Sequence, residues 1–193
     1  YYILVASFSN PYDVYAGKTF LTPSGFTFDG YKAVFADANI LSGYANSILY
    51  TVLGTIYSVA LIYMVAYPLS VAELPGRKAL SIFFLITMYF GGGIIPYFLL
   101  INQLGLMNSM WVLLIHNAVN VYNMIIMRTQ FISLPDDLRE AATLDGAGDL
   151  RLLWSVLLPL SGAVSAVLIL FTAVGYWNMW FDPMIYLTKR SMY

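Results

Sequence analysis

Long hydrophobic runs without a charged side chain alternate with short charged segments along the chain. Residues 38–72, 79–127 and 152–181 contain no Asp, Glu, Lys or Arg. Each run exceeds the ~20 residues that a helix needs to cross the hydrocarbon core of a bilayer. The pattern therefore predicts membrane-spanning helices over about 45–67, 79–101, 111–127 and 155–175.

Glycine and proline residues interrupt this pattern at defined places. Residues 10–43 are rich in turn formers, so we expect a long loop there. Pro68 is expected to end one span. Gly91-Gly92-Gly93 with Pro96 should kink the next, either as a gate or as a packing adjustment. Residues 1–8 have the composition of the outgoing end of an earlier span, which predicts a chain cut inside its first membrane helix and short of its last.

Composition strengthens the membrane prediction and excludes several functions. Hydrophobic residues make up 60% of the 193 residues and charged residues 10%, whereas soluble domains carry about 25% charged residues. A net charge of −1 gives no basic surface for nucleic acid. The absence of cysteine excludes thiolate catalysis and cysteine-ligated metal. If the spans alternate, five of the nine basic residues lie on the side of residues 128–151. We therefore expect 128–151 to be cytoplasmic and 10–43 extracytoplasmic.

The charged segment after the 111–127 span has the signals of a short capped helix. Ser133 with Asp136 fits a capping box, and Pro135 suits a first helical turn. Gly146 and Gly148 are expected to stop the helix. A second helix should begin near Asp149 and run toward the next span. The segment predicts two short helices joined by a tight bend.

The surface of the first short helix suggests a contact with another protein. Ala141 and Ala142 allow close approach of another backbone, and Glu140 offers one directed carboxylate. Leu138 and Leu144 extend the apolar stripe. Two interpretations stay open at this point: a docking knob, or a capped interfacial helix that joins two spans.

The spacing within this segment resembles a known motif. Glu140-Ala141-Ala142, Gly146 and Val156-Leu157-Leu158-Pro159 are similar to the EAA motif of permease subunits of binding-protein-dependent ABC importers, with Val156 where isoleucine is usual. Pro68-Leu69-Ser70 and Trp177-Asn178 resemble the carbohydrate branch, which is related to the maltose-type importers.

The resemblance implies an all-α, polytopic transmembrane bundle. The family normally has six spans, of which this chain would lack most of the first and all of the last. Residues 1–193 would form a single permease domain that contains a cytoplasmic coupling-helix loop at 134–150.

The same resemblance implies partners and a transport role in the cell membrane. The loop would dock onto an ATP-binding ABC subunit, which would bind ATP and Mg, so this chain would bind no cofactor and would not be an enzyme. A second permease subunit, forming a heterodimer, and an extracytoplasmic solute-binding protein would complete an importer for an oligosaccharide or other carbohydrate. The residues implied in ATPase docking are Glu140, Ala141, Ala142, Asp145, Gly146, Leu158 and Pro159.

Polar residues inside the spans are candidates for a substrate path. Asn117, Asn120 and Asn123 recur every third residue, so on a continuous helix they would lie near one face. Amides bind sugar hydroxyls, but they also form hydrogen bonds between helices. Trp177 and Asn178 could line the path or anchor the chain at the interface.

Two other classes of protein, a secondary transporter or channel and a membrane enzyme, predict different features in the sequence. A secondary transporter or channel without an ATPase predicts ionisable residues within spans, and the predicted spans offer only His116. His116 is expected to be packed or hydrogen-bonded rather than to bind a metal, because no acidic residue or cysteine shares its span. A membrane enzyme predicts clustered acids, which are not found within a span.

Overall fold

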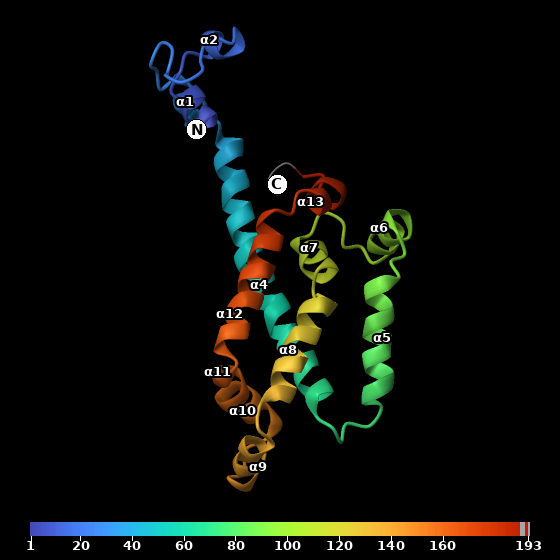
Figure 1. Ribbon diagram of the computed structural model, residues 1–193. Coiled ribbons are helices and arrows are strands. Elements are labelled where there is room, and N and C mark those ends of the chain that lie inside the picture. Colours follow the sequence, from blue (N-terminus) through green and yellow to red (C-terminus); the bar gives the residue numbers. More distant parts are fainter. Residues whose placement is uncertain (190–191, 193) are drawn as a thin grey trace. The chain divides into compact units, whose positions relative to one another are not determined.

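The computed structural model describes residues 1–189 and 192, and in those residues it contains helices but no strand (Figure 1). The chain divides into two compact units, Tyr1–Asn46 and Ser47–Tyr193. The candidate functional residues all belong to the second unit.

The first unit contains three short helices, an aromatic cluster and the beginning of the long helix described below. The helices are α1 (Tyr2–Ser7), α2 (Pro11–Tyr15) and α3 (Asp29–Ala36). The Asn10 side chain caps α2 by accepting from the Tyr12 N–H at 3.0 Å. Phe8 stacks on Phe26 with ring centroids 5.7 Å apart. The predicted loop over 10–43 is therefore wrong in part, because Asn10-Pro11 is a helix start as well as a turn signal.

The longest helix, α4 (Ala38–Ser70), has 33 residues and rises about 50 Å. It is the one helix among the described residues that is by itself long and apolar enough to cross a membrane. It begins before the predicted span over 45–67 and continues two residues beyond Pro68. Pro68 therefore does not end the helix. A proline removes one hydrogen bond, and here it falls in the last turn, where little helix remains to be disrupted.

The other predicted spans are broken, each into a bent pair of segments. Segments α5 (Arg77–Tyr89) and α6 (Ile94–Gln103) meet at 113°, and α7 (Met110–His116) and α8 (Val121–Ser133) meet at 53°. The segment Asp149–Leu160 meets α12 (Gly162–Trp177) at 91°. Counting each pair as one span gives up to four candidate spans in the described chain. At residues 91–93 the chain therefore changes direction by more than the predicted kink.

The charged segment forms a group of short helices at one end of the second unit, and we call residues 134–160 the hairpin (Figure 1). Helix α9 (Asp136–Leu144) precedes α10 (Asp149–Leu152), which continues as a π-helical turn, η1 (Leu153–Leu157), and as α11 (Leu158–Leu160). The expected capping box is not formed. Ser133 is the last residue of α8, and its hydroxyl donates to the Gln130 carbonyl at 2.7 Å.

Two hydrophobic clusters hold the second unit together. The larger cluster joins α4, α8, the α10–η1 segment and α12 through side chains such as Ile62, Met127 and Leu157. The smaller one contains Tyr50, Val112 and Tyr186, the last of which belongs to α13 (Phe181–Tyr186).

Candidate functional site

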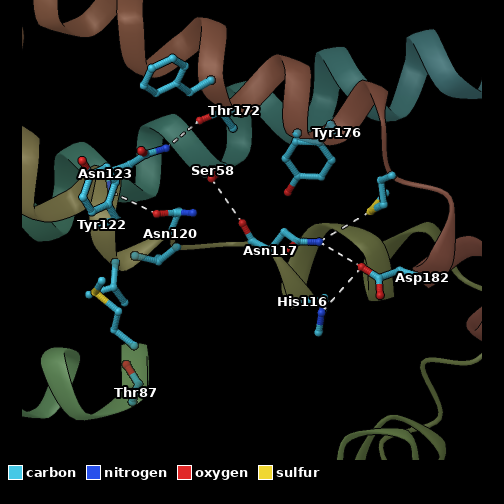
Figure 2. Close-up of a pocket in the computed structure, with 16 residues that line it drawn as sticks. Ser58, Thr87, His116, Asn117, Asn120, Tyr122, Asn123, Thr172, Tyr176 and Asp182 are labelled. Atoms are coloured by element: carbon cyan, nitrogen blue, oxygen red, sulfur yellow. Dashed lines mark hydrogen bonds and ion pairs between the residues drawn. The ribbon is translucent and has the colours of Figure 1, made fainter. Parts of the chain in front are cut away.

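A polar pocket of about 530 Å³ lies within the second unit (Figure 2). Helices α4, α5, α8 and α12 contribute to its wall, together with the α7–α8 break and the segment around α13. Its lining consists of Ser58, Thr87, Met88, His116, Asn117, Val119, Asn120, Val121, Tyr122, Asn123, Phe171, Thr172, Gly175, Tyr176, Met179 and Asp182.

The break between α7 and α8 brings the three expected asparagines to this pocket. The helix ends at His116, and Asn117 occupies its C-terminal cap position. Asn120 starts α8, and its side chain accepts from the Asn123 N–H at 3.0 Å. The expected continuous helix is therefore wrong, since two of the amides are at helix ends. The pocket nevertheless collects all three, because the break turns them toward the same space.

An acidic residue distant in sequence completes this part of the pocket. The Asn117 amide donates to Asp182 Oδ2 at 3.2 Å across 65 residues, and the Asn117 carbonyl accepts from the Ser58 hydroxyl at 3.4 Å. His116 Nε2 lies 3.7 Å from the same Asp182 oxygen. Burial, and then the nearby Asp182 carboxylate, raise the pKa of the Tyr186 phenol. Asp182 is the only Asp, Glu, Lys or Arg in the described lining, and no sequence signal linked it to His116.

The Tyr176 ring contacts α4 at a glycine. A Cβ added to Gly54 would lie 2.5 Å from this ring, so only glycine leaves it room. Tyr176 is 6% exposed, and no described residue forms a hydrogen bond with its hydroxyl. Figure 2 shows this hydroxyl directed toward the side of the pocket that holds Asn117.

The two remaining residues predicted for a substrate path lie outside the pocket lining. Trp177 is the last residue of α12 and remains about half exposed. Asn178 caps this helix, and its amide donates to the Val174 carbonyl at 2.9 Å.

The hairpin exposes the surface expected for docking. Helix α9 has no buried residue, and Glu140 and Ala141 are exposed on it. Ala142 packs against the larger hydrophobic cluster. After α9, Gly146 has a φ of +75°, a left-handed conformation that strongly favours glycine. Asp145 is exposed beside it; Leu158 is partly buried, and Pro159 is exposed in α11.

Polar side chains attach the hairpin and α8 to the last turn of α4. Arg128 Nε of α8 donates to the Leu69 carbonyl at 2.8 Å. Arg139 Nη2 of α9 donates to the Ser70 hydroxyl at 3.0 Å, and the Tyr67 hydroxyl donates to Asp149 Oδ1 of α10 at 2.6 Å. The hairpin is therefore fixed to α4 as well as to its two neighbours in sequence.

Comparison with protein families gives a match over residues 38–181 to the family described as "Binding-protein-dependent transport system inner membrane component". The chain belongs to this family. The matched region includes the whole hairpin and all of the pocket lining except Asp182. As an inner membrane component of a transport system, the chain is a membrane protein of the permease type.

Known members of this permease family resemble the chain over nearly its whole length. The "Polygalacturonan/rhamnogalacturonan transport system permease protein YtcP" of Bacillus subtilis (strain 168) is 38% identical over 98% of this chain and 66% of its own length. The "Diacetylchitobiose uptake system permease protein NgcG" of Streptomyces coelicolor is 30% identical over 98% of this chain and 64% of its own length. The chain thus spans about two thirds of the length of these relatives.

A solved structure shares the fold. The crystal structure of a bacterial ABC transporter involved in the import of the acidic polysaccharide alginate contains a similar chain, with a TM-score of 0.95 and 37% sequence identity. The match covers 99% of this chain and 68% of the other. The expected all-α permease fold of the carbohydrate branch is therefore confirmed.

Proposed function

We propose that this chain is the membrane-spanning permease part of an ATP-driven importer for an oligosaccharide or related carbohydrate. The observation that carries the proposal is the exposed α9 hairpin, which presents Glu140 and Ala141 and turns at a left-handed Gly146. This is the part of the chain with the EAA pattern, and the family is defined by binding-protein-dependent transport.

In the proposed mechanism, α9 is a coupling helix that lies in a groove of an ATP-binding subunit. Glu140 makes the polar contact, Ala141 packs in the groove, and Gly146 permits the bend. Ala142 presents only its exposed part to the groove, because it also packs against the chain's own hydrophobic cluster. Asp145, Leu158 and Pro159 shape the return to the membrane. ATP and Mg bind the partner ATPase, whose closure moves the hairpin and shifts the permease between two states.

In this proposal, the pocket forms part of the substrate path. Its amides and hydroxyls both donate and accept hydrogen bonds and its single carboxylate accepts them, so the lining suits a hydroxyl-rich ligand. The names of the relatives refer to transport of polygalacturonan/rhamnogalacturonan and to uptake of diacetylchitobiose, and that of the solved structure to import of alginate. These names support a glycan as the class of substrate.

The assembly and its orientation follow from the same proposal. The hairpin side, with residues 128–151, faces the cytoplasm, and residues 10–43 face outward toward an extracytoplasmic solute-binding protein. A second permease subunit, in a heterodimer, completes the path. Residues 134–150 form the coupling loop of one permease domain.

Affinity purification of the full-length protein from membranes tests the proposal. The wild type should retain an ATP-binding subunit, identified by mass spectrometry, and Glu140→Lys should lose most of it, because the docking carboxylate is reversed in charge. Glu73→Lys is the matched control, since Glu73 is exposed in the turn between α4 and α5 and outside the hairpin. If a folded wild type retained no ATPase, the proposal would fail.

A transporter or channel without an ATPase is the second candidate. One observation favours it: the pocket contains the ionisable pair His116 and Asp182, 3.7 Å apart, and ionisable residues at membrane depth often carry ions or protons. This candidate predicts that no ATP-binding subunit is recovered and that transport depends on an ion gradient.

A further inference from the structure

The last turn of α4 forms hydrogen bonds with three separate parts of the chain, accepting two of them and donating one. Arg128 comes from α8, Arg139 from α9 and Asp149 from α10. The acceptor of Arg128 is the Leu69 carbonyl, one of the last four carbonyls of α4, for which the helix supplies no backbone N–H. This turn is thus a point of attachment rather than a free helix end.

Two of these contacts bond the hairpin itself to α4, in addition to the apolar packing of its α10–η1 segment in the larger hydrophobic cluster. Arg139 Nη2 bonds to the Ser70 hydroxyl at 3.0 Å and to the Phe131 carbonyl at 2.8 Å, which joins α9 to both α4 and α8. The Ser70 hydroxyl in turn donates to the Tyr67 carbonyl at 2.7 Å. Tyr67 is 8% exposed, and its hydroxyl donates to Asp149. We call Tyr67, Ser70, Arg139 and Asp149 the α4 clamp.

Hydrophobic packing alone holds α9 weakly. None of its residues is buried, and Leu144 is 88% exposed. From α9 and the linker before it, Ala142 and Leu134 reach the larger hydrophobic cluster, both only partly buried. Hydrogen bonds to charged groups are about twice as strong as neutral ones. The clamp, and not apolar burial, therefore sets the position of α9 against α4.

Among the three helices in contact with the hairpin, α4 is the one that is not its neighbour in sequence. It is continuous from the clamp to Ser58, which lines the pocket about 14 Å along the helix axis. One turn further, Gly54 contacts the Tyr176 ring. The other two helices follow the hairpin's neighbours in sequence: α8 runs unbroken from the pocket-lining Asn123 to the hairpin, and α12 is reached past a 91° bend. Movement of the hairpin therefore reaches α4 only through non-covalent contacts.

We propose that Arg139 and Asp149 are positioning residues that clamp the coupling hairpin to α4, so that ATP-driven movement of the hairpin reaches the pocket through α4. This inference rests on the proposed function and adds a route to it. The clamp residues lie behind the docking surface and touch neither the ATPase nor the substrate in this scheme. Their loss should therefore separate docking from movement at the pocket.

The test measures ATP-driven change at Ser58 in the complex of the full-length protein with its ATPase. Since the 193 residues contain no cysteine, Ser58→Cys adds a single reporter thiol to them. Any cysteine elsewhere in the full-length protein is removed first. The rate at which a maleimide labels this thiol is compared with and without ATP and Mg. The clamp is removed by Tyr67→Phe together with Arg139→Gln.

Matched controls lie beside each clamp residue. Tyr63 is a buried tyrosine one turn earlier on α4, where it contacts Trp154 edge to face, so Tyr63→Phe controls for Tyr67→Phe. Arg151 is exposed on α10, and the structure shows no hydrogen bond or ion pair from it among the described residues, so Arg151→Gln controls for Arg139→Gln. Arg139→Lys keeps a charged donor and should restore most of the response.

The expected result is that the double clamp variant still copurifies with the ATPase, while the ATP-dependent change in labelling falls about tenfold, the scale of one charge-assisted hydrogen bond. Both controls should keep the full response. An unchanged response in the double variant would overturn the clamp. Loss of the ATPase from a folded double variant would also overturn it, because these residues would then shape the docking surface. Failure of the wild type to bind an ATPase would instead overturn the proposed function.

Discussion

The hairpin and the pocket both depend on polar side chains, but the chain assembles them in opposite ways. The hairpin takes its residues from one continuous stretch, 134–160, and presents Glu140 outward. The pocket collects its lining from residues as far apart as Ser58 and Asp182, and several of its polar side chains bond to one another. A contact surface of the first kind can be recognised locally, whereas a cavity of the second kind exists only in the folded chain.

Glycine has a different purpose in each region. Gly146 in the hairpin has a positive φ, and a Cβ there would meet nothing within 4 Å. Gly54 at the pocket has an ordinary helical backbone, and a Cβ there would collide with Tyr176. The hairpin thus needs glycine for backbone conformation, and the pocket needs it for space. Two tests follow from this difference, and a third concerns the polar side chains of the pocket.

The largest effect is expected at Gly54. Gly54→Ala should lower the free energy of unfolding by about 2 kcal/mol, because overpacking a buried contact costs about 1–3 kcal/mol. Gly43→Ala on the same helix meets nothing within 4 Å and should instead raise it by about 0.5–1 kcal/mol. Unfolding in detergent, followed by circular dichroism, measures both. Equal effects at the two sites would show that the Tyr176 ring moves aside freely.

A smaller effect is expected at the hairpin turn. Gly146→Ala should cost about 1–2 kcal/mol, because the left-handed conformation brings Cβ close to the next carbonyl. Gly148 has a φ of −75°, so Gly148→Ala should cost much less. Because the loss is local, amide hydrogen exchange of α9 is the suitable measurement. Equal protection in the two variants would argue that the bend does not need the left-handed residue.

The smallest effect is expected inside the pocket. Asn117→Ala removes the hydrogen bond to Asp182, and uptake of a labelled oligosaccharide should fall about twofold to tenfold, the scale of one hydrogen bond. Asn178→Ala removes an equal side chain that lies outside the pocket lining, and uptake should stay within a factor of two. A larger loss at Asn178 would move the substrate path toward the end of α12.

Local signals in the sequence predicted the helical hairpin, the existence of the spans and the interruption at residues 91–93, but not the breaks after His116 and at Ser161. Gly146 is a helix-stop signal that depends on its own backbone, and the structure has this turn. The break after His116 has no glycine or proline to mark it. It is supported by contacts such as Ser58 with Asn117, which tertiary packing alone creates.

The pocket was predictable only as a set of polar residues with no partner assigned. Asn117, Asn120 and Asn123 stood out because amides are rare in apolar runs. Asp182 did not, because it lies just beyond a predicted span, where an acidic residue is ordinary. The role of Gly54 was invisible as well, since a glycine within a helix carries no sign of the ring that crosses it.

The right angle at Ser161 has a mechanical consequence. The segment Asp149–Leu160 and helix α12 form a right-angled lever, with arms of about 18 Å and 24 Å. The pivot is firm, because Ser161 is 1% exposed and its N–H bonds to two carbonyls at 3.0 and 3.1 Å. Rotation of both segments about Ser161 by about 10° would move the far end of α12 by about 4 Å. A small sideways displacement of Asp149–Leu160 would thereby produce a larger displacement of the end of α12 that holds Tyr176.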